Sequence, residues 1–184
     1  DNKVKVVTPQ EISRAAKRAK GFILPFLGKL ADHTSRAVTA PNNDTLYSSA
    51  WLDLSEEPLE ENIATSVEFY KRMAPLGMSI EIELGVTGGE EDGVDNSDVE
   101  NDKLYTQPQH VAYAYKELGK VGDLFTVAAA FGNVHGVYSP GNVELRPEIL
   151  KNSQDYIERE FKTKSKPVYF VFHGGSGSPQ HQIR

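Results

Sequence analysis

The sequence predicts an α/β protein with a parallel sheet, and two observations support this prediction. From residue 55 onward, segments with helical periodicity alternate with short apolar segments, which is typical of strands connected by helical crossovers. The apolar runs at 125–131 and 168–172 are continuous rather than alternating, as expected for strands that are buried on both faces. The pattern indicates three helix–strand units, preceded by a helix, a turn and a strand.

The composition limits the size and class of the protein. With 184 residues the chain can form one domain with a core, but it is shorter than the ~250 residues of a complete eight-stranded α/β barrel. A net charge of −6 without a basic stripe argues against nucleic acid as a partner. The absence of cysteine leaves His, Asp and Glu as metal ligands. No apolar run approaches the ~20 residues of a membrane span, and no signal-peptide pattern is found, so we expect no membrane contact and a cytoplasmic location.

Residues 1–54 form the first expected segment. A Thr-Pro-Gln-Glu sequence near its start has the form of a capping box, which predicts a helix over 8–20. A turn is expected at 41–44, because Asn and Asp tolerate left-handed backbone conformations. A strand at 46–54 then carries Trp51, the only tryptophan.

Residues 55–184 are expected to hold the three helix–strand units. Ser55 is the expected cap of the first helix, and Gly77 is its expected end. The acidic, glycine-rich segment 85–102 is expected to be a mobile loop over a site, because it lacks aromatic residues. The other expected elements are a strand at 78–84, helices at 106–118 and 145–161, and strands at 125–131 and 168–172.

The strand at 78–84 alternates carboxylate and aliphatic side chains. Glu81 and Glu83 should share one face, whereas the aliphatic side chains should share the other. A solvent-exposed strand with an acidic turn has the same pattern, so this strand alone does not define a site.

Histidine follows two of the later strands, and in each case glycine comes next, as His135-Gly136 and His173-Gly174. Functional side chains of parallel sheets gather at the carboxyl ends of the strands. Together with Glu83, the two imidazoles form a ligand set for a borderline divalent metal, with zinc the natural candidate. A single such histidine is more often structural, but two at equivalent positions favour a site.

The segment after His173 is rich in glycine and serine over 174–179. Glycine amides before a helix start can form a phosphate cradle, so an anion site is expected there. His33, His110 and His181 lack a comparable context and are expected on the surface.

Four segments between residues 53 and 184 carry specific motifs, namely EIELGVTGGEEDGVDN, LYTQPQHV, FGNVHGVYSPGNV and FHGGSGS. They closely resemble the class II, zinc-dependent fructose-bisphosphate aldolase family, particularly its fungal members. The resemblance implies a (β/α)8 TIM barrel, of which this chain would form part, and normally a homodimer. It also implies the reversible aldol cleavage of fructose 1,6-bisphosphate to dihydroxyacetone phosphate and glyceraldehyde 3-phosphate, a reaction of glycolysis and gluconeogenesis.

The resemblance also implies roles for individual residues. His135 and His173 match zinc ligands, and Glu83 matches a carboxylate associated with an alternative zinc position. Glu91 matches the catalytic acid/base that handles the proton beside the enediolate. The matches to the phosphate-binding positions are Gly136, Gly174 and Ser176, and these three together with Val134 match a site for a monovalent cation, Na⁺ or K⁺.

The chain departs from the family pattern in three respects. The first barrel strands, with an Asp-His pair that supplies a zinc ligand and a catalytic acid, have no counterpart. A later Asn-x-Asp-Thr strand is also absent. Ser139 stands where family members often carry lysine, which removes a charge near the phosphate pocket. We therefore expect weak zinc binding and no normal turnover from this chain alone.

The N-terminal segment carries a different resemblance. TAPNNDTLYSSAWLDLS is similar to a signature of the uncharacterised family called domain of unknown function 1254, over residues 7–55. The two resemblances meet at 52–57. Half a barrel would leave unpaired strand edges, which favours a composite or incomplete sequence over a natural fusion. The expected domains are an uncharacterised segment over 1–54 and a partial aldolase barrel over 55–184.

Three functional hypotheses follow from the sequence. The chain represents a class II aldolase with its chemistry at Glu91, His135 and His173. Alternatively, it belongs to the uncharacterised family and has a binding or structural role. The third hypothesis is a non-catalytic fragment that binds phosphosugars or partner subunits.

Overall fold

The computed structural model describes residues 48–86, 88–91, 94–95, 104–135 and 144–174. Its main feature is a four-stranded parallel sheet in the order β1-β2-β5-β7, so that the order of these four strands across the sheet is the same as their order along the chain. The strands are β1 (Ser49–Leu52), β2 (Ser79–Leu84), β5 (Phe125–Ala129) and β7 (Tyr169–Val171).

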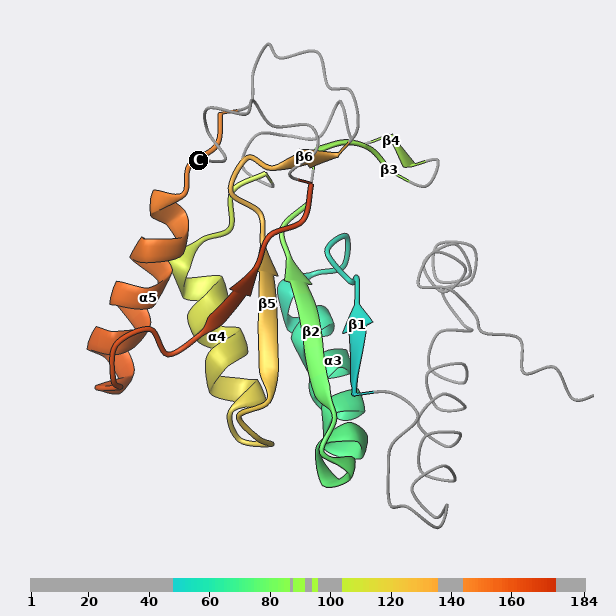
Figure 1. Ribbon diagram of the computed structural model, residues 1–184, viewed down its shortest axis with the longest axis vertical. Coiled ribbons are helices and arrows are strands. Elements are labelled where there is room, and N and C mark those ends of the chain that lie inside the picture. Colours follow the sequence, from blue (N-terminus) through green and yellow to red (C-terminus); the bar gives the residue numbers. More distant parts are fainter. Residues whose placement is uncertain (1–47, 87, 92–93, 96–103, 136–143, 175–184) are drawn as a thin grey trace, which may run out of the picture.

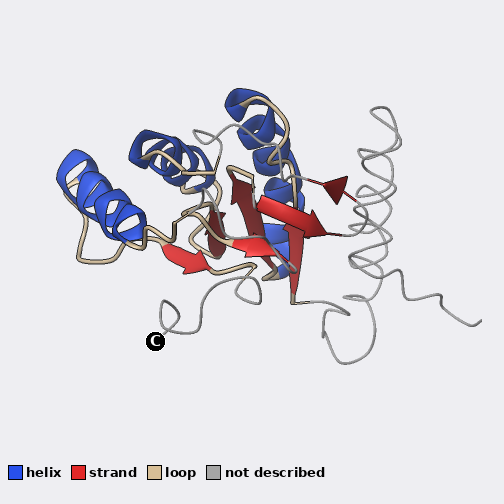
Figure 2. Ribbon diagram, turned by 90° about the horizontal axis from the view of Figure 1, so that it is seen from above, coloured by secondary structure: helices blue, strands red, loops and turns tan. Residues whose placement is uncertain are grey.

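One α-helix lies in each of the three connections between these strands, and the three helices cover the same face of the sheet (Figures 1 and 2). This arrangement confirms the predicted α/β fold with three helix–strand units. The helices are α3 (Leu59–Met73), α4 (Pro108–Leu118) and α5 (Glu148–Phe161).

Helix α3 begins later than the sequence predicted. Pro58, rather than Ser55, occupies the N-cap position, so the prediction of Ser55 as the cap is wrong. Acidic residues in the first turn and basic residues in the last turn complement the helix dipole. A short 3₁₀ helix, η1 (Ala74–Leu76), follows and ends at Gly77, whose φ of +70° is left-handed. The prediction that Gly77 closes this helical segment is confirmed.

A second, smaller sheet lies beyond the carboxyl ends of the large sheet (Figure 1). Its order is β4-β3-β6, formed by β3 (Gly88–Glu91), β4 (Val94–Asp95) and β6 (Val134–His135). Strand β3 runs antiparallel to β4 and parallel to β6. The expectation of an unstructured loop over 85–102 is therefore wrong for β3 and β4. Glycine-rich, acidic strands have no apolar alternation, so the sequence pattern did not reveal them.

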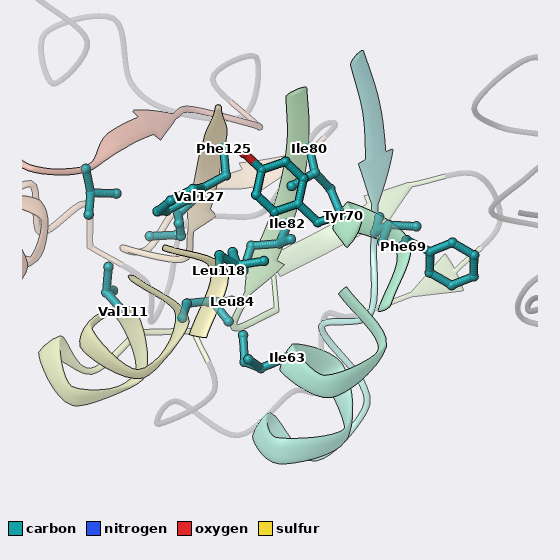
Figure 3. Packing of buried hydrophobic residues seen from close by; sticks show 14 of the residues in the cluster. Ile63, Phe69, Tyr70, Ile80, Ile82, Leu84, Val111, Leu118, Phe125 and Val127 are labelled. Atoms are coloured by element: carbon teal, nitrogen blue, oxygen red, sulfur yellow. The ribbon is translucent and has the colours of Figure 1, made fainter. Parts of the chain in front are cut away.

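The hydrophobic core lies between the large sheet and its helices (Figure 3). On β2 the aliphatic side chains face the helices and are at most 2% exposed, which confirms the predicted division of this strand into two faces. The described helices include none long and apolar enough to cross a membrane. Core residues labelled in Figure 3 include Ile63, Tyr70, Ile80, Ile82, Leu84, Val111, Leu118 and Val127.

Gly132 follows β5 at a position that only glycine can occupy. Its φ is +88°, and a Cβ atom there would lie 2.1 Å from the carbonyl oxygen of Glu144. Gly77 also has a positive φ, but nothing lies within 4 Å of its Cβ position. We expect Gly132→Ala to lower the free energy of unfolding by about 3 kcal/mol or more, through backbone strain and steric overlap together. Gly77→Ala should cost only about 1–2 kcal/mol, from strain alone. Urea unfolding of both variants tests the difference, and equal losses would contradict the close approach at Gly132.

Burial of the Tyr70 side chain leads us to expect a loss of stability at alkaline pH. Its side chain is fully buried, and its hydroxyl accepts a hydrogen bond from the Leu124 amide at 2.8 Å. Burial raises the pKa of Tyr70 above the ordinary value of 10.0; Asp123 adds to the rise and the Leu124 amide opposes it. Because folding favours the protonated phenol, its contribution is fully present below pH 10 and is lost as the pH rises toward the folded-state pKa. Urea unfolding between pH 8 and pH 11 should show a smaller decline for Tyr70→Phe than for the parent chain.

Candidate active site

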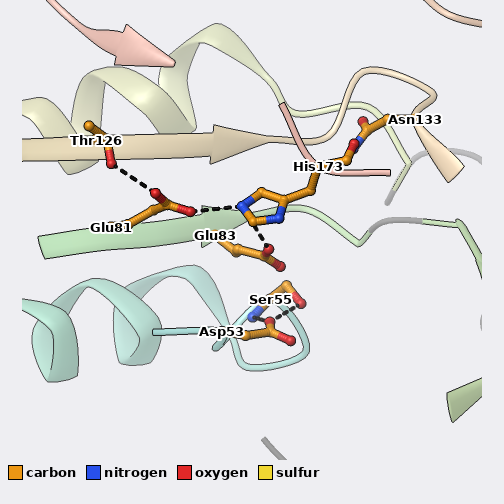
Figure 4. A network of polar contacts seen from close by, with 7 residues as sticks. All are labelled: Asp53, Ser55, Glu81, Glu83, Thr126, Asn133 and His173. Carbon is orange, nitrogen blue, oxygen red and sulfur yellow. Dashed lines mark hydrogen bonds and ion pairs between the residues drawn. The ribbon is translucent and has the colours of Figure 1, made fainter. Parts of the chain in front are cut away.

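Acidic and imidazole side chains meet on the face of the sheet opposite to the helices (Figure 4). Glu81 and Glu83 project from β2, and His173 lies two residues beyond the end of β7. The Nε2 atom of His173 lies 2.7 Å from Oε1 of Glu81 and 3.9 Å from Oε1 of Glu83. The side chains of the three residues are between 10% and 28% exposed, so this cluster is only partly accessible to water.

Two further residues contact this cluster. Thr126 on β5 donates a hydrogen bond from its hydroxyl to Oε2 of Glu81 at 3.4 Å. The ring of Trp51 on β1 stacks on the imidazole of His173, with 5.6 Å between the centroids and 19° between the planes. All four strands of the large sheet therefore contribute to the surroundings of His173, directly or from the segment that follows the strand.

The turn after β1 is held by a local hydrogen-bond pair. The amide and the hydroxyl of Ser55 both donate to Oδ1 of Asp53, at 3.1 and 2.7 Å. Asp53 thus organises the turn that leads into α3, which explains why Ser55 does not cap the helix.

Three buried polar side chains connect the carboxyl ends of the four strands, and we call them the bridging residues. Asn62 on α3 donates to the carbonyl oxygens of Leu54 and Glu83, both at 2.9 Å, and so connects the ends of β1 and β2. Its exposed fraction is 2%. These bonds hold the backbone of Glu83 in place from the helix side.

The other bridging residues connect the remaining strand ends in the same way. The Thr106 hydroxyl donates to the carbonyl oxygen of Leu84 and accepts from the Ala130 amide at 2.9 Å, which connects β2 to β5. Asn133 accepts from the Phe131 amide and donates to the carbonyl oxygen of His173, each at 2.9 Å, which connects β5 to the segment after β7. The backbone of His173 is therefore positioned by a residue that follows β5.

Two of the three predicted metal-binding residues, Glu83 and His173, come together in this cluster. His135 and Val134 lie on β6 and Glu91 lies on β3, in the second sheet, where Gly89 is the register partner of His135. Their side chains, together with Gly136 and Ser176, lie outside the described residues. Among the side chains that the structure describes, no group of three His, Asp or Glu residues is placed to hold a metal ion.

The structure also describes two other residues named in the sequence analysis, Gly174 and His110. Gly174 is buried and has a left-handed φ of +75°. His110 is exposed on α4, as predicted.

Sequence reasoning missed several residues of the site. The alternation in β2 predicts the correct face for Glu81, and its spacing of two residues from Glu83 is the signal that points to a shared role. Trp51 and Thr126 carried no such signal, because their contacts with the cluster join distant strands. The bridging residues were also missed, since an isolated Asn or Thr in a helix or loop has no distinctive pattern.

Comparisons with known proteins agree with the motifs. A family model described as "Fructose-bisphosphate aldolase class-II" matches residues 13–184. The chain belongs to the class II fructose-bisphosphate aldolase family. The family is metal-dependent, and its members act on phosphorylated sugars.

Individual aldolases show the extent of the match. A fructose-bisphosphate aldolase from Campylobacter jejuni is 53% identical over 163 residues, which are 88% of this chain and 46% of that protein. An Aspergillus oryzae aldolase is 48% identical over 163 residues, 88% of this chain and 45% of that protein, so the similarity is not particular to fungi. A crystal structure of the Campylobacter jejuni aldolase superposes with a TM-score of 0.71 at 51% identity, covering 88% of this chain and 45% of that one. The chain spans about half the length of these aldolases.

The aldolase match extends into the N-terminal segment. It begins at residue 13, and β1 (Ser49–Leu52) pairs in parallel register with β2 in the same sheet. The comparisons do not support the separate resemblance over residues 7–55. The domain boundary between residues 54 and 55 stays a prediction.

The donor atoms in the described part of the site fit a divalent metal of the zinc type. A carboxylate and an imidazole are ligands that zinc prefers, and their partial burial would strengthen the interaction with a cation. Glu81 contacts the imidazole from outside this pair, as carboxylates commonly do beside metal-bound histidines. The two donors, Glu83 and His173, would form part of a site with further ligands.

Asn62 offers a test of how the strand ends are held. Asn62→Ala removes the hydrogen bonds to the two carbonyl oxygens and also the acceptor of the Ser66 hydroxyl, which lies 3.3 Å from Oδ1 of Asn62. We expect the free energy of unfolding to fall by about 1–3 kcal/mol. Asn152→Ala, at an exposed position of α5, is the matched control and should change it by less than about 0.7 kcal/mol, because only helix propensity is altered. Urea unfolding measures both, and equal effects would contradict the bridging role.

Proposed function

We propose that this chain is part of a class II aldolase that catalyses the reversible cleavage of fructose 1,6-bisphosphate to dihydroxyacetone phosphate and glyceraldehyde 3-phosphate. The reaction belongs to glycolysis and gluconeogenesis. The observation that carries the proposal is that the side chains of Glu83 and His173 lie side by side at the carboxyl ends of parallel strands, with 3.9 Å between Oε1 and Nε2, in a chain of the aldolase family. Because the chain spans about half the length of its relatives, the proposal concerns a complete barrel in which β1, β2, β5 and β7 are consecutive strands.

Zinc is the metal that we propose for this site. His135 and His173 would hold the ion, and Glu83 would hold it in an alternative position. When bound, zinc supplies Lewis-acid polarisation of the ketone oxygen, so that no lysine Schiff base is needed. The side chains of Glu83 and His173 lie next to each other, and this proximity supports two of these three assignments.

Glu91 is the proposed acid/base. In the cleavage direction a base takes the proton of the C4 hydroxyl, C4 becomes the aldehyde carbonyl as the C3–C4 bond breaks, and the electron pair of that bond remains on the enediolate of the three-carbon product. The base for the C4 hydroxyl is not among the residues assigned here. The Glu91 carboxyl then delivers a proton to C3, and in the reverse direction its carboxylate removes that proton. The position of Glu91 on β3, in the small sheet beyond the strand ends, supports a role at this edge.

Backbone amides are the proposed phosphate ligands, at Gly136, Gly174 and Ser176. The left-handed φ of Gly174 supports this role, because such a turn can direct successive amides toward an anion. The same residues with Val134 would hold a monovalent cation, Na⁺ or K⁺. We further propose that the complete protein is a cytoplasmic homodimer.

Two histidine-to-alanine variants test whether His173 binds the metal. His173→Ala should remove a zinc ligand and lower both the zinc content of the 184-residue chain and its affinity for zinc. His110→Ala is the matched control, because His110 is exposed on α4 and should leave zinc binding unchanged. Metal analysis after dialysis and competition with a chromophoric chelator provide the readouts. Zinc binding that is equal in both variants would contradict the assignment.

Turnover is measured separately, by coupled detection of triose phosphate from fructose 1,6-bisphosphate. Cleavage that is lost in His173→Ala but kept in His110→Ala would support catalysis by this chain. Zinc and phosphosugar binding without cleavage would instead identify the chain as a non-catalytic part of the barrel.

A further inference from the structure

His173 is held by two side chains that the proposed chemistry does not use. Glu81 contacts the edge of its ring at Nε2, 2.7 Å away, and Trp51 covers its face. Neither contact is local, since Trp51 lies on the first strand of the sheet and Glu81 is separated from His173 by 92 residues. We propose that Glu81 and Trp51 are positioning residues that fix the tautomer and the ring plane of His173 for metal binding. This inference rests on the proposed role of His173 as a ligand.

The contact with Glu81 specifies where the ring proton lies. An ionised carboxylate can only accept hydrogen bonds, so Nε2 must carry the proton that it donates. In the neutral ring the lone pair then resides on Nδ1, which becomes the nitrogen suited to bind a metal. Carboxylates that accept from the far nitrogen of a metal-bound histidine have this effect in many metal sites. Thr126 in turn donates to the second oxygen of Glu81 and restrains that carboxylate.

The contact with Trp51 specifies the plane of the ring. In the sheet order β1-β2-β5-β7, three strand spacings of about 4.8 Å separate β1 from β7, or about 14 Å in a flat sheet. The two rings nevertheless stack with 5.6 Å between their centroids. The two rings therefore meet over the acidic face at a shorter distance than the strand spacing of a flat sheet would give. The stack limits rotation of the imidazole, whose residue lies beyond the last paired residue of β7.

Trp51 performs this role by packing rather than by hydrogen bonding. Its indole Nε1 is buried and has no hydrogen-bond partner among the described residues. A buried donor without an acceptor is unfavourable, so the indole N–H does not explain the placement of this side chain. Phenylalanine should therefore replace tryptophan here with the stack retained, whereas alanine should not.

The first test reads the tautomer of His173 in the metal-free 184-residue chain. Long-range ¹H–¹⁵N spectra, recorded at a pH where the ring is neutral, distinguish a protonated nitrogen from one with a lone pair. We expect the parent chain to show the Nε2–H form. Glu81→Gln should give a mixture of both tautomers, because an amide offers a donor as well as an acceptor. A single, unchanged tautomer in Glu81→Gln would overturn the role of Glu81.

The second test reads zinc affinity by competition with a chromophoric chelator. Glu81→Gln and Trp51→Ala should weaken binding by about 10- to 100-fold, the usual effect of removing a residue that orients a metal ligand. Trp51→Phe should stay close to the parent. Tyr169→Ala removes an aromatic side chain that is 73% exposed on β7, and as the control it should change nothing. Equal affinity in Trp51→Ala and Trp51→Phe would overturn the role of Trp51.

The two tests separate this inference from the proposed function. If the parent chain binds no zinc, zinc binding by the ligands of this chain alone is contradicted, whereas the tautomer still decides whether Glu81 orients the ring. The sole tryptophan adds a third readout, because bound Co²⁺ next to the stacked imidazole should quench its fluorescence in the parent chain and not in His173→Ala. Quenching that is equal in both would show that the ion binds elsewhere and would overturn the proposed geometry.

Discussion

The candidate site depends on the hydrogen bonds that the bridging residues form between the carboxyl ends of the strands. Few backbone hydrogen bonds between the strands continue past the strand ends, one of them from the Ala130 amide to the Leu84 carbonyl oxygen, and the backbone there needs further partners. Asn62, Thr106 and Asn133 supply those partners, one for each pair of consecutive strands. Each is at most 3% exposed, so its hydrogen bonds form away from competing water. The strand ends are thereby held close enough for their side chains to form one cluster.

The second constraint is the difference between the two faces of β2. One face carries aliphatic side chains that pack against the helices, and this burial provides the favourable hydrophobic term. The other face carries Glu81 and Glu83, and carboxylates of low exposure need polar partners. His173 lies close to both carboxylates, and Thr126 contacts Glu81. Stability and the candidate chemistry therefore use opposite faces of the same six-residue strand.

Much of the fold could be predicted from the sequence, because helices and strands impose local periods on apolar residues. The period in β2, the continuous apolar run of β5 and the left-handed glycine after η1 are all features of short segments. The start of α3 was misplaced because Ser55 bonds to Asp53 instead of capping the helix. Strands β3 and β4 were missed because pairing between glycine-rich segments leaves no apolar alternation.

The sequence by itself determined which side chains share a face of β2, which residues follow the strands, and to which family the motifs point. It placed Glu83 and His173 at the same edge of the sheet, since parallel strands end at a common edge. Only the tertiary structure decided that Glu81 contacts the ring of His173 at Nε2 and that Trp51 stacks on it. Those contacts depend on the register and curvature of four strands together, and no local pattern of residues records that geometry.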